Sequence, residues 1–526
     1  MGGNARASGP DFSTGIGIET LPDAATIAGH VGEDAVLLSR FGGEYFAVGG
    51  TCTHYGAALS SGLCAGDTVR CPWHHACFSL KTGAALRAPA LDDLDAWQVE
   101  VEGDTLFVRK RQEHPASPTP THRSDARSIV IVGAGAAGLA CAHELRRLGY
   151  SGALTMLSAD ADPPVDRPNL SKDYLAGTAE EAWMPLRPGD WYEENRIDLR
   201  LGCEIERIDS ASRRVHSVSG EQFAYDRLLI ATGSEPNRLQ GPGFERDNVF
   251  TLRSFADARA IAARARSGMR AAVIGSSFIG LEAAAALRHR GLEVDIVSPE
   301  PVPFEGVFGE EVGRFLQHLH ERNGVRFHLG TVADSFDGRA LSLANGQRLE
   351  ADLVLVGIGV RPRLEIAQSA GLADKGGIAV DTFLRTEVPD VYAAGDIAAA
   401  PNPRTGEPQR IEHWVVAERQ GQIAAANMLG LGRRYDMVPF FWTEQFGVLL
   451  RYVGHAAKWD KVDIDGDVAG GDFIARYSSQ SSHLASAGVG RDLEILEDER
   501  RMEERIAEAV ERDPGAREPH PAAAVK

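Results

Sequence analysis

Cys52-Thr-His54 is followed, after sixteen residues, by Cys71-Pro-Trp-His74. Each of these two short stretches pairs one cysteine with one histidine, in the patterns C-x-H and C-x-x-H. Two thiolates and two imidazoles on two loops can hold a binuclear iron–sulfur cluster, with the cysteines on one iron and the histidines on the other. The two stretches therefore predict a metal centre whose ligands are Cys52, His54, Cys71 and His74.

A zinc site is the alternative for these four residues, because zinc also accepts two cysteines and two histidines. Zinc patterns usually keep the cysteines in one C-x-x-C pair and the histidines in another pair. Here each half mixes the two residue types, which favours the binuclear cluster of the Rieske arrangement. The nearby residues His75, Cys64 and Cys77 are not assigned as ligands and are expected to pack around the site.

The region that carries the two stretches is predicted to be a small all-β domain. Residues 35–39, 44–48, 97–101 and 105–108 are short runs rich in β-branched and aromatic residues, separated by glycine-containing turns. We therefore expect a β domain over residues 14–110. The polar, proline-rich residues 111–126 that follow are typical of an extended linker.

A first dinucleotide-binding pattern begins after this linker. The apolar residues 128–132 predict a buried strand, which runs into Gly133-Ala-Gly135-Ala-Ala-Gly138 and a helix. In this G-x-G-x-x-G context the glycines permit a tight turn, close approach to a pyrophosphate and packing of the helix on the strand. Asp160 lies twenty-two residues beyond Gly138, where a carboxylate can accept hydrogen bonds from ribose hydroxyls.

A second copy of the pattern occupies residues 270–289. Gly275 and Gly280 keep the first and third positions, whereas Ser277 replaces the middle glycine. Two such folds in one chain predict two dinucleotides, one tightly bound and one that exchanges.

Composition limits the classes of function that remain. The length of 526 residues allows three or four domains, and the net charge of −19 argues against a nucleic-acid surface. No run of eighteen apolar residues predicts a membrane span, and residues 1–13 do not resemble a secretory signal. Four of the six cysteines are scattered outside the proposed cluster, which favours a reducing cytoplasm over a disulfide framework.

The last part of the chain is predicted to form a smaller α+β domain over residues 435–512. Within it, residues 494–511 are highly charged and are expected to form a helix on the solvated surface. Residues 513–526 are expected to be a disordered tail.

Several segments together resemble a known family. Residues 127–480 resemble the FAD-dependent ferredoxin reductases, which are two-dinucleotide-fold flavoproteins of the pyridine nucleotide-disulfide oxidoreductase superfamily. The whole chain resembles the subset with a fused N-terminal Rieske domain, the apoptosis-inducing-factor-3-like proteins. Beside the two cluster stretches, the segments that carry the resemblance are Asp166-Arg-Pro-Asn-Leu-Ser-Lys172, Ala231-Thr-Gly233, Gly280-Leu-Glu282, Gly395-Asp396, Glu412-His-Trp414 and Phe441-Trp-Thr-Glu444.

The resemblance implies a multidomain protein with an α/β core between the two smaller domains. The FAD-binding domain would span residues 127–248 and 380–434, and the NAD(P)H-binding domain residues 249–379. The expected FAD contacts are Gly133, Gly135, Gly138, Asp160, Arg167, Lys172, Thr232, Gly233 and Asp396, with Trp414 and Trp442 near the flavin ring. The expected nicotinamide nucleotide contacts are Gly275, Gly280, Glu282, Glu300 and Gly357.

Two departures from the family refine these expectations. Ser298 stands where the family places an acidic residue at the end of the second-fold strand, and Glu300 follows two residues later. Since Glu300 would repel a 2′-phosphate, NADH is favoured over NADPH. Cys141 stands alone in the first helix, without the C-x₄-C pair of disulfide reductases.

The implied function is an oxidoreductase that passes electrons from NAD(P)H through FAD to the Rieske [2Fe–2S] cluster and then to a one-electron acceptor such as a ferredoxin, cytochrome or oxygenase component. This chemistry belongs to the cofactors, and no catalytic acid, base or nucleophile is assigned. The protein would be a monomer or homodimer without nucleic-acid or membrane partners. An NAD(P)H oxidase or quinone reductase, and a redox-responsive signalling flavoprotein with slow turnover, remain as alternatives.

Overall fold

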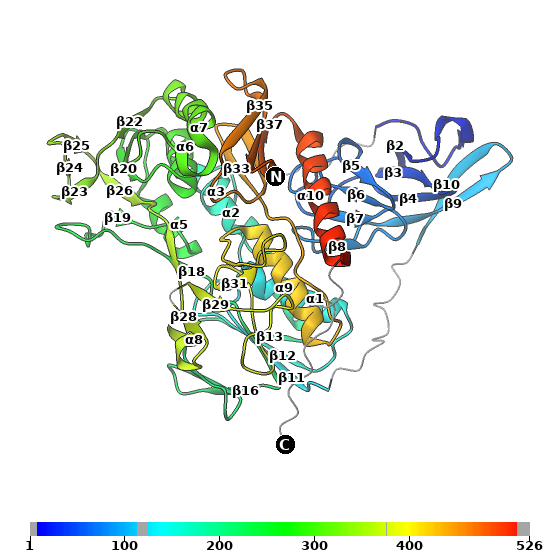
Figure 1. The fold of residues 1–526 in the computed structure, drawn as a ribbon, viewed down its shortest axis with the longest axis horizontal. Helices are drawn as coiled ribbons and strands as arrows, with labels where there is room; N and C mark the ends of the chain where they lie inside the picture. Colours follow the sequence, from blue (N-terminus) through cyan, green and yellow to red (C-terminus); the bar gives the residue numbers. More distant parts are fainter. Residues whose placement is uncertain (1–7, 113–124, 375, 513–526) are drawn as a thin grey trace.

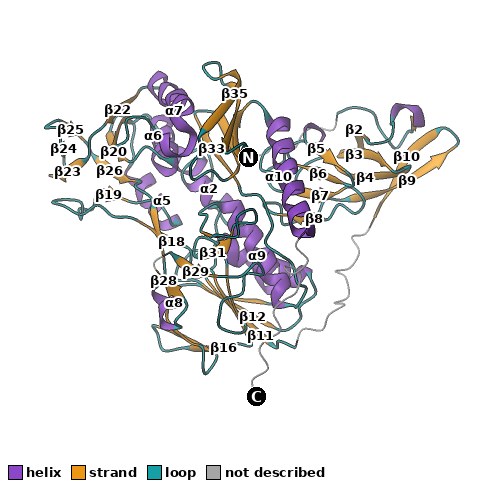
Figure 2. Ribbon diagram, in the orientation of Figure 1, coloured by secondary structure: helices purple, strands orange, loops and turns teal. Residues whose placement is uncertain are grey.

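The computed structural model describes residues 8–112, 125–374 and 376–512 (Figure 1). Most of the predicted linker at 111–126 and all of the predicted tail at 513–526 lie outside these residues. The described parts form an all-β region, then an α/β core, then a mixed region of strands and one long helix (Figure 2). The predicted multidomain fold class is therefore confirmed.

Antiparallel strands build the N-terminal region. A six-stranded sheet has the order β1-β10-β9-β4-β3-β2, and a four-stranded sheet has the order β5-β6-β7-β8. The bounds are β1 Ile16–Gly17, β2 Ala25–Val31, β3 Asp34–Phe41, β4 Glu44–Gly49, β5 Leu63–Ala65, β6 Thr68–Arg70, β7 Cys77–Ser79, β8 Ala85–Arg87, β9 Ala96–Glu102 and β10 Thr105–Gln112. The two cluster stretches follow β4 and β6, so both lie at ends of short strands.

The first dinucleotide fold is a five-stranded parallel sheet of order β13-β12-β11-β17-β30. Strand β11 covers the predicted residues Ser128–Val132, and the predicted helix after the glycine turn is α1 (Ala136–Arg147). Helix α1 packs against α9 (Trp414–Met428). The other strands are β12 Ala153–Leu157, β13 Ile197–Arg200, β17 Arg227–Ile230 and β30 Val391–Ala393.

The second dinucleotide fold repeats this arrangement. Its sheet has the order β19-β26-β20-β21-β22, and its first helix is α6 (Phe278–His289). The bounds of its other elements are β19 Val249–Phe250, α5 Phe255–Arg264, β20 Arg270–Ile274, β21 Glu293–Ser298, α7 Glu305–Arg322, β22 Val325–Leu329 and β26 Leu353–Val356. In both folds the glycine turn follows the central first strand, at the edge where a nucleotide binds in such sheets.

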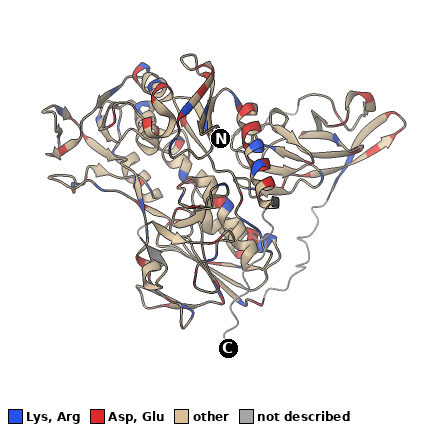
Figure 3. Ribbon diagram, viewed as in Figure 1, with Lys and Arg blue, Asp and Glu red and all other residues tan. Residues whose placement is uncertain are grey.

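The C-terminal region is an antiparallel sheet of order β33-β34-β37-β36-β35, followed by helix α10 (Asp492–Arg512). The strands are β33 Phe440–Gln445, β34 Val448–Gly454, β35 Lys461–Asp467, β36 Asp472–Ser479 and β37 Ser482–Val489. Helix α10 lies between the N-terminal β region and the rest of the molecule (Figure 1). Charged residues recur along it (Figure 3).

The expectation of a solvated surface helix at 494–511 is wrong for one face of α10. Ile495, Leu496 and Met502 are buried, and so are the charged residues Asp498 and Glu499. The buried carboxylates have partners on other elements: Arg476 on β36 for Asp498, and His75 on the N-terminal loop for Glu499. Sequence alone shows the charges of a helix but not the partners that let it be buried.

Among the described helices, none is both long enough and apolar enough to cross a membrane.

Candidate redox site

The two cluster loops have the same backbone pattern. The amide of Cys52 donates to the carbonyl of Ala57 at 2.9 Å, and the amide of Cys71 donates to that of Ala76 at 2.8 Å. In each loop the residue four positions after the cysteine adopts a left-handed conformation, with φ +80° at Gly56 and +60° at His75. Each loop thus folds back on itself and turns its cysteine and histidine toward one centre.

The four predicted ligands form a sulfur pair and a nitrogen pair. Nδ1 of His54 lies 3.1 Å from Nδ1 of His74. A hydrogen bond between the thiols of Cys71 and Cys52, aided by the backbone N–H groups of Trp73 and His74, holds the pKa of Cys71 below its usual value despite burial. The same hydrogen bond, together with burial, raises the pKa of Cys52. Burial lowers the pKa of His54 to about 3 and also holds the pKa of His74 well below its usual value, so both imidazoles are neutral, which is the form that binds metals.

The pairing of cysteine with cysteine and of histidine with histidine fits a binuclear cluster. A [2Fe–2S] cluster needs only two ligands at each iron, in the distribution seen here. All six cysteines are free thiols, so no disulfide competes for Cys52 or Cys71.

A large cavity of about 630 Å³ opens between the two dinucleotide folds and the C-terminal sheet. Most of the predicted cofactor contacts line it. They are Gly135, Arg167, Lys172, Gly233, Gly275, Glu282, Glu300, Gly357, Asp396, Trp414 and Trp442. The cavity therefore joins residues that the sequence assigned to two separate nucleotides.

The glycines of the first turn are required by contact distances. A Cβ atom on Gly133, whose φ is +109°, would lie 2.1 Å from the carbonyl oxygen of Ala231, and one on Gly138 would lie 1.9 Å from that of Gly133. Gly275 and Gly280 have equivalent clashes in the second turn, at 2.3 Å and 2.1 Å. These four glycines shape the turns, and only Gly275 of the four also lines the cavity.

Cationic side chains stand where an anionic nucleotide would be expected in the first fold. Gly135 is the N-cap of helix α1, no side chain caps this end, and Gly135, Ala136 and Ala137 line the cavity. Burial, together with repulsion from Arg253, lowers the pKa of Arg167 to about 10. Nε of Arg253 is buried without a partner among the described residues. A bound pyrophosphate would supply further negative charge beside these two guanidinium groups, which fits FAD.

Acidic residues of the cavity are held in fixed positions. Glu282 accepts hydrogen bonds from Ser171 at 2.5 Å and Thr443 at 2.7 Å, and it pairs with Lys172 at 2.8 Å. Asp396 pairs with Arg253 at 2.7 Å. Sequence reasoning had assigned Glu282 and Asp396 but had not found Arg253, because nothing in its sequence context marks it.

Glu300 faces the cavity through a chain of hydroxyls. Ser276 donates to Ser298 at 2.7 Å, and Ser298 donates to the Glu300 carboxylate. Ser298 is fully buried, whereas Glu300 lines the cavity. Ser298 occupies the strand end, where the family resemblance led us to expect an acidic residue. Its hydroxyl holds the carboxylate of Glu300 in position.

Two predicted contacts lie beside the large cavity. The hydroxyl of Thr232 donates to the Arg363 carbonyl at 3.1 Å. Asp160 lines a smaller adjoining cleft with Gly135 and Arg167, and lies 3.6 Å from the Arg167 guanidinium.

Trp442 connects the cluster loops with the cavity. Its ring centroid lies 4.2 Å from that of His74 and 6.4 Å from that of His54, and the same side chain lines the cavity. Tyr55 stacks on His54 with a centroid distance of 4.0 Å, and its hydroxyl donates to Asp166 of the core. The histidine side of the cluster site therefore faces the α/β core of the same chain, a contact that no sequence pattern had revealed.

Comparison with known proteins gives a consistent result. Residues 127–421 match the family model of pyridine nucleotide-disulphide oxidoreductases, and residues 18–112 match that of the Rieske [2Fe-2S] domain. The chain is 35% identical over 482 residues to Apoptosis-inducing factor 3 of Homo sapiens, covering 88% of this chain and 79% of that protein. It is 37% identical over 372 residues to the anthranilate 1,2-dioxygenase system ferredoxin–NAD(+) reductase component of Burkholderia cepacia, covering 69% and 92%. It resembles the crystal structure of the covalent putidaredoxin reductase–putidaredoxin complex with a TM-score of 0.70 and 31% identity, covering 73% and 94%.

Proposed function

The chain belongs to the pyridine nucleotide-disulphide oxidoreductase family and carries an N-terminal Rieske domain, and from this premise we propose that it passes electrons from NAD(P)H by way of FAD to its own Rieske cluster and on to a one-electron acceptor. FAD, when bound, accepts two electrons as a hydride and can release them singly, which matches a one-electron cluster. Relatives named ferredoxin–NAD(+) reductases support this direction of transfer.

The observation that carries the proposal is the contact between His74 and Trp442. Because Trp442 also lines the cavity, one packed ring separates the cavity from a proposed cluster ligand. Tyr55 and Asp166 link the same two regions. This close packing supports the proposal, because electron transfer is efficient only over short distances.

We assign Cys52, His54, Cys71 and His74 to the cluster. The residues that we assign to FAD are Gly133, Gly135, Gly138, Asp160, Arg167, Thr232, Gly233 and Asp396. Trp414 and Trp442 are assigned to its ring. Gly275, Gly280, Glu282, Glu300 and Gly357 are assigned to the nicotinamide nucleotide. Lys172 is assigned to FAD, and its ammonium group pairs with Glu282 of the nicotinamide set at 2.8 Å.

The acceptor is proposed to be a small redox protein, because solved relatives include a reductase in complex with putidaredoxin. The six free thiols support a reducing compartment, and we propose the cytoplasm. Reduction of both flavin and cluster by NADH under anaerobic conditions tests the function. Assays with cytochrome c, quinone and oxygen separate a reductase from an oxidase or quinone reductase.

NADH is proposed as the preferred electron donor, and a Glu300→Ala variant tests this. The carboxylate of Glu300 should repel a 2′-phosphate and accept hydrogen bonds from a 2′-hydroxyl. Since a hydrogen bond to a charged group contributes about 1.5–3 kcal/mol, its loss should raise the KM for NADH by about 10- to 100-fold. The KM for NADPH should stay equal or fall. Steady-state kinetics with both nucleotides measure the change, and a wild-type enzyme that prefers NADPH would contradict the assignment.

A further inference from the structure

His75, which follows the proposed ligand His74, occupies a backbone position that suits glycine. The equivalent position in the other cluster loop is Gly56, and both residues are left-handed. A side chain at positive φ carries a conformational cost that glycine avoids. In addition, Nε2 of His75 is buried without a hydrogen-bond partner among the described residues, which is also unfavourable. Considered by itself, the loop would therefore be more stable with glycine at position 75.

The imidazole of His75 reaches out of the Rieske domain into the C-terminal region. It stacks on Phe440 of β33 with a centroid distance of 4.0 Å and an interplanar angle of 20°. Its Nδ1 donates to Oε2 of Glu499 on α10 at 2.7 Å. Both His75 and Glu499 are about 1% exposed. This contact is closed to water, and it joins the second cluster loop to the C-terminal region.

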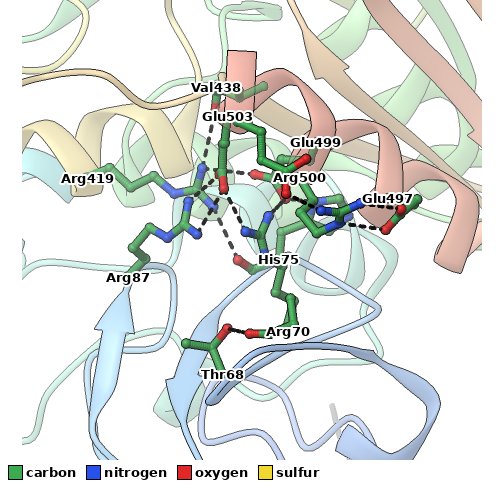
Figure 4. Close-up of polar contacts among 12 residues, drawn as sticks. Thr68, Arg70, His75, Arg87, Arg419, Val438, Glu497, Glu499, Arg500 and Glu503 are labelled. Carbon is green, nitrogen blue, oxygen red and sulfur yellow. Dashed lines mark hydrogen bonds and ion pairs between the residues drawn. The ribbon is translucent and has the colours of Figure 1, made fainter. Parts of the chain in front are cut away.

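Arg419 of helix α9 completes this junction (Figure 4). Its guanidinium donates to the carbonyl oxygens of His75 and Ala88 in the Rieske domain, each at 3.2 Å. It also donates to the Val438 carbonyl at 3.1 Å and to Glu499 at 3.3 Å. One fully buried side chain thereby ties two Rieske loops to the FAD-binding region and to α10.

Two further arginines of the Rieske domain contact the same middle stretch of α10. Arg70 lies 3.7 Å from Glu499 and 2.6 Å from Glu503, and Arg87 also pairs with Glu503. Although burial disfavours the Glu499 carboxylate, His75, Arg419 and Arg87 hold its pKa below the usual range. The Glu499 carboxylate is therefore charged and fully partnered, which is the condition under which a buried charge is tolerated.

We propose that His75, Glu499 and Arg419 form an anchor that positions the second cluster loop on the reductase core and thereby sets the rate at which the cluster is reduced. This inference rests on the proposed function, because it assigns positioning residues to that electron transfer. His74, the neighbour of His75 in the chain, is the ligand in contact with Trp442. A shift of the loop would therefore alter the separation between the cluster ligands and the cavity.

His75→Gly and Glu499→Gln test the anchor in the full-length holoprotein. Glycine retains the left-handed backbone and removes only the imidazole, and glutamine retains the size of the glutamate while removing its charge. In stopped-flow reduction by NADH, flavin bleaching should be unchanged, whereas the cluster step should slow severalfold, since electron transfer becomes slower as the two redox groups move apart. Hydrogen–deuterium exchange of residues 71–78 should increase in both variants, while the EPR spectrum of the chemically reduced cluster stays unchanged.

The controls separate the anchor from general effects. Glu494→Gln removes a carboxylate of the same helix that pairs with Arg476 and Arg491 of the C-terminal region, and it should leave both the kinetics and the exchange unchanged. The double variant His75→Gly/Glu499→Gln should be no slower than the slower single variant, because both remove one contact.

Cluster reduction at the wild-type rate in both single variants would overturn the anchor. If His75→Gly does not assemble a cluster, Glu499→Gln decides the question. Failure of NADH to bleach the wild-type flavin would instead contradict the proposed function. Hydrogen–deuterium exchange would still test the anchor if the function were wrong. Unchanged exchange of residues 71–78 in the two variants would contradict the anchor, and increased exchange would support the view that it positions the second cluster loop.

Discussion

A Cys71→Ser variant is expected to lose the iron–sulfur cluster and with it nearly all NADH-dependent reduction of a one-electron acceptor such as cytochrome c. A serine hydroxyl is a poor replacement for a thiolate ligand of iron. Loss of a residue that only supports a metal ligand lowers metal affinity or activity by about 10- to 100-fold. Loss of a ligand itself should therefore lower acceptor reduction by more than about 100-fold. Flavin bleaching by NADH should persist, because the cavity residues lie on other elements. Iron content, the EPR spectrum of the reduced protein and acceptor kinetics measure the outcome.

Cys64→Ser provides the matched control for this variant. Cys64 lies in the same domain, and its thiol only approaches the Thr26 hydroxyl at 3.9 Å. It should retain the cluster and the wild-type rate. If Cys71→Ser still reduces cytochrome c at the wild-type rate, the flavin reduces the acceptor directly and the cluster is not on the path. Rapid turnover with quinone or oxygen in that variant would favour the oxidase or quinone reductase.

Trp442→Ala should slow reduction of the cluster more than it slows reduction of the flavin by NADH. The substitution removes the ring that contacts His74 at 4.2 Å and lines the cavity, and it leaves space that water can enter. We expect the cluster step to slow severalfold, because electron transfer is less efficient across an empty or water-filled gap than through packed atoms. Truncation of a half-buried aromatic ring should also lower the free energy of unfolding, by up to about 3 kcal/mol. Stopped-flow absorbance separates flavin reduction from cluster reduction.

Two further variants make the Trp442 result specific. Trp442→Phe keeps an aromatic ring in the gap and should recover most of the rate. Trp183→Ala removes a tryptophan that is 47% exposed and should have no effect on either step. A Trp442→Ala enzyme with the wild-type rate of cluster reduction would show that electrons take another route. A flavin that NADH no longer reduces would indicate instead that Trp442 is needed to bind the flavin or the nucleotide.

The sequence predicted those parts of the site that depend on local geometry. Gly133 and Gly138 could be assigned because a strand, a tight turn and a helix admit no side chain there. The ligand stretches could be assigned because C-x-H and C-x-x-H place mixed ligands on two loops. The predicted domain boundaries and the individual cofactor contacts remain predictions.

Contacts between domains could not be predicted, because they depend on the relative placement of distant segments. Arg419 and Glu499 lie eighty residues apart on two helices, and each alone is an ordinary charged residue of a helix. His75 was expected only to pack near the cluster, and its bond to Glu499 spans 424 positions of the chain. Helix α10 was expected to be solvated because its sequence shows the carboxylates but not the Rieske arginines that neutralise them.

The central claim, that NADH reduces the Rieske cluster through the flavin of the same chain, is tested most directly by anaerobic titration of the holoprotein with NADH, followed by optical and EPR spectroscopy. The flavin absorbance should bleach and a Rieske-type EPR signal of the reduced cluster should appear, and its rate of appearance should be independent of protein concentration. A flavin that bleaches while the cluster stays EPR-silent, although dithionite reduces that cluster, would contradict the claim.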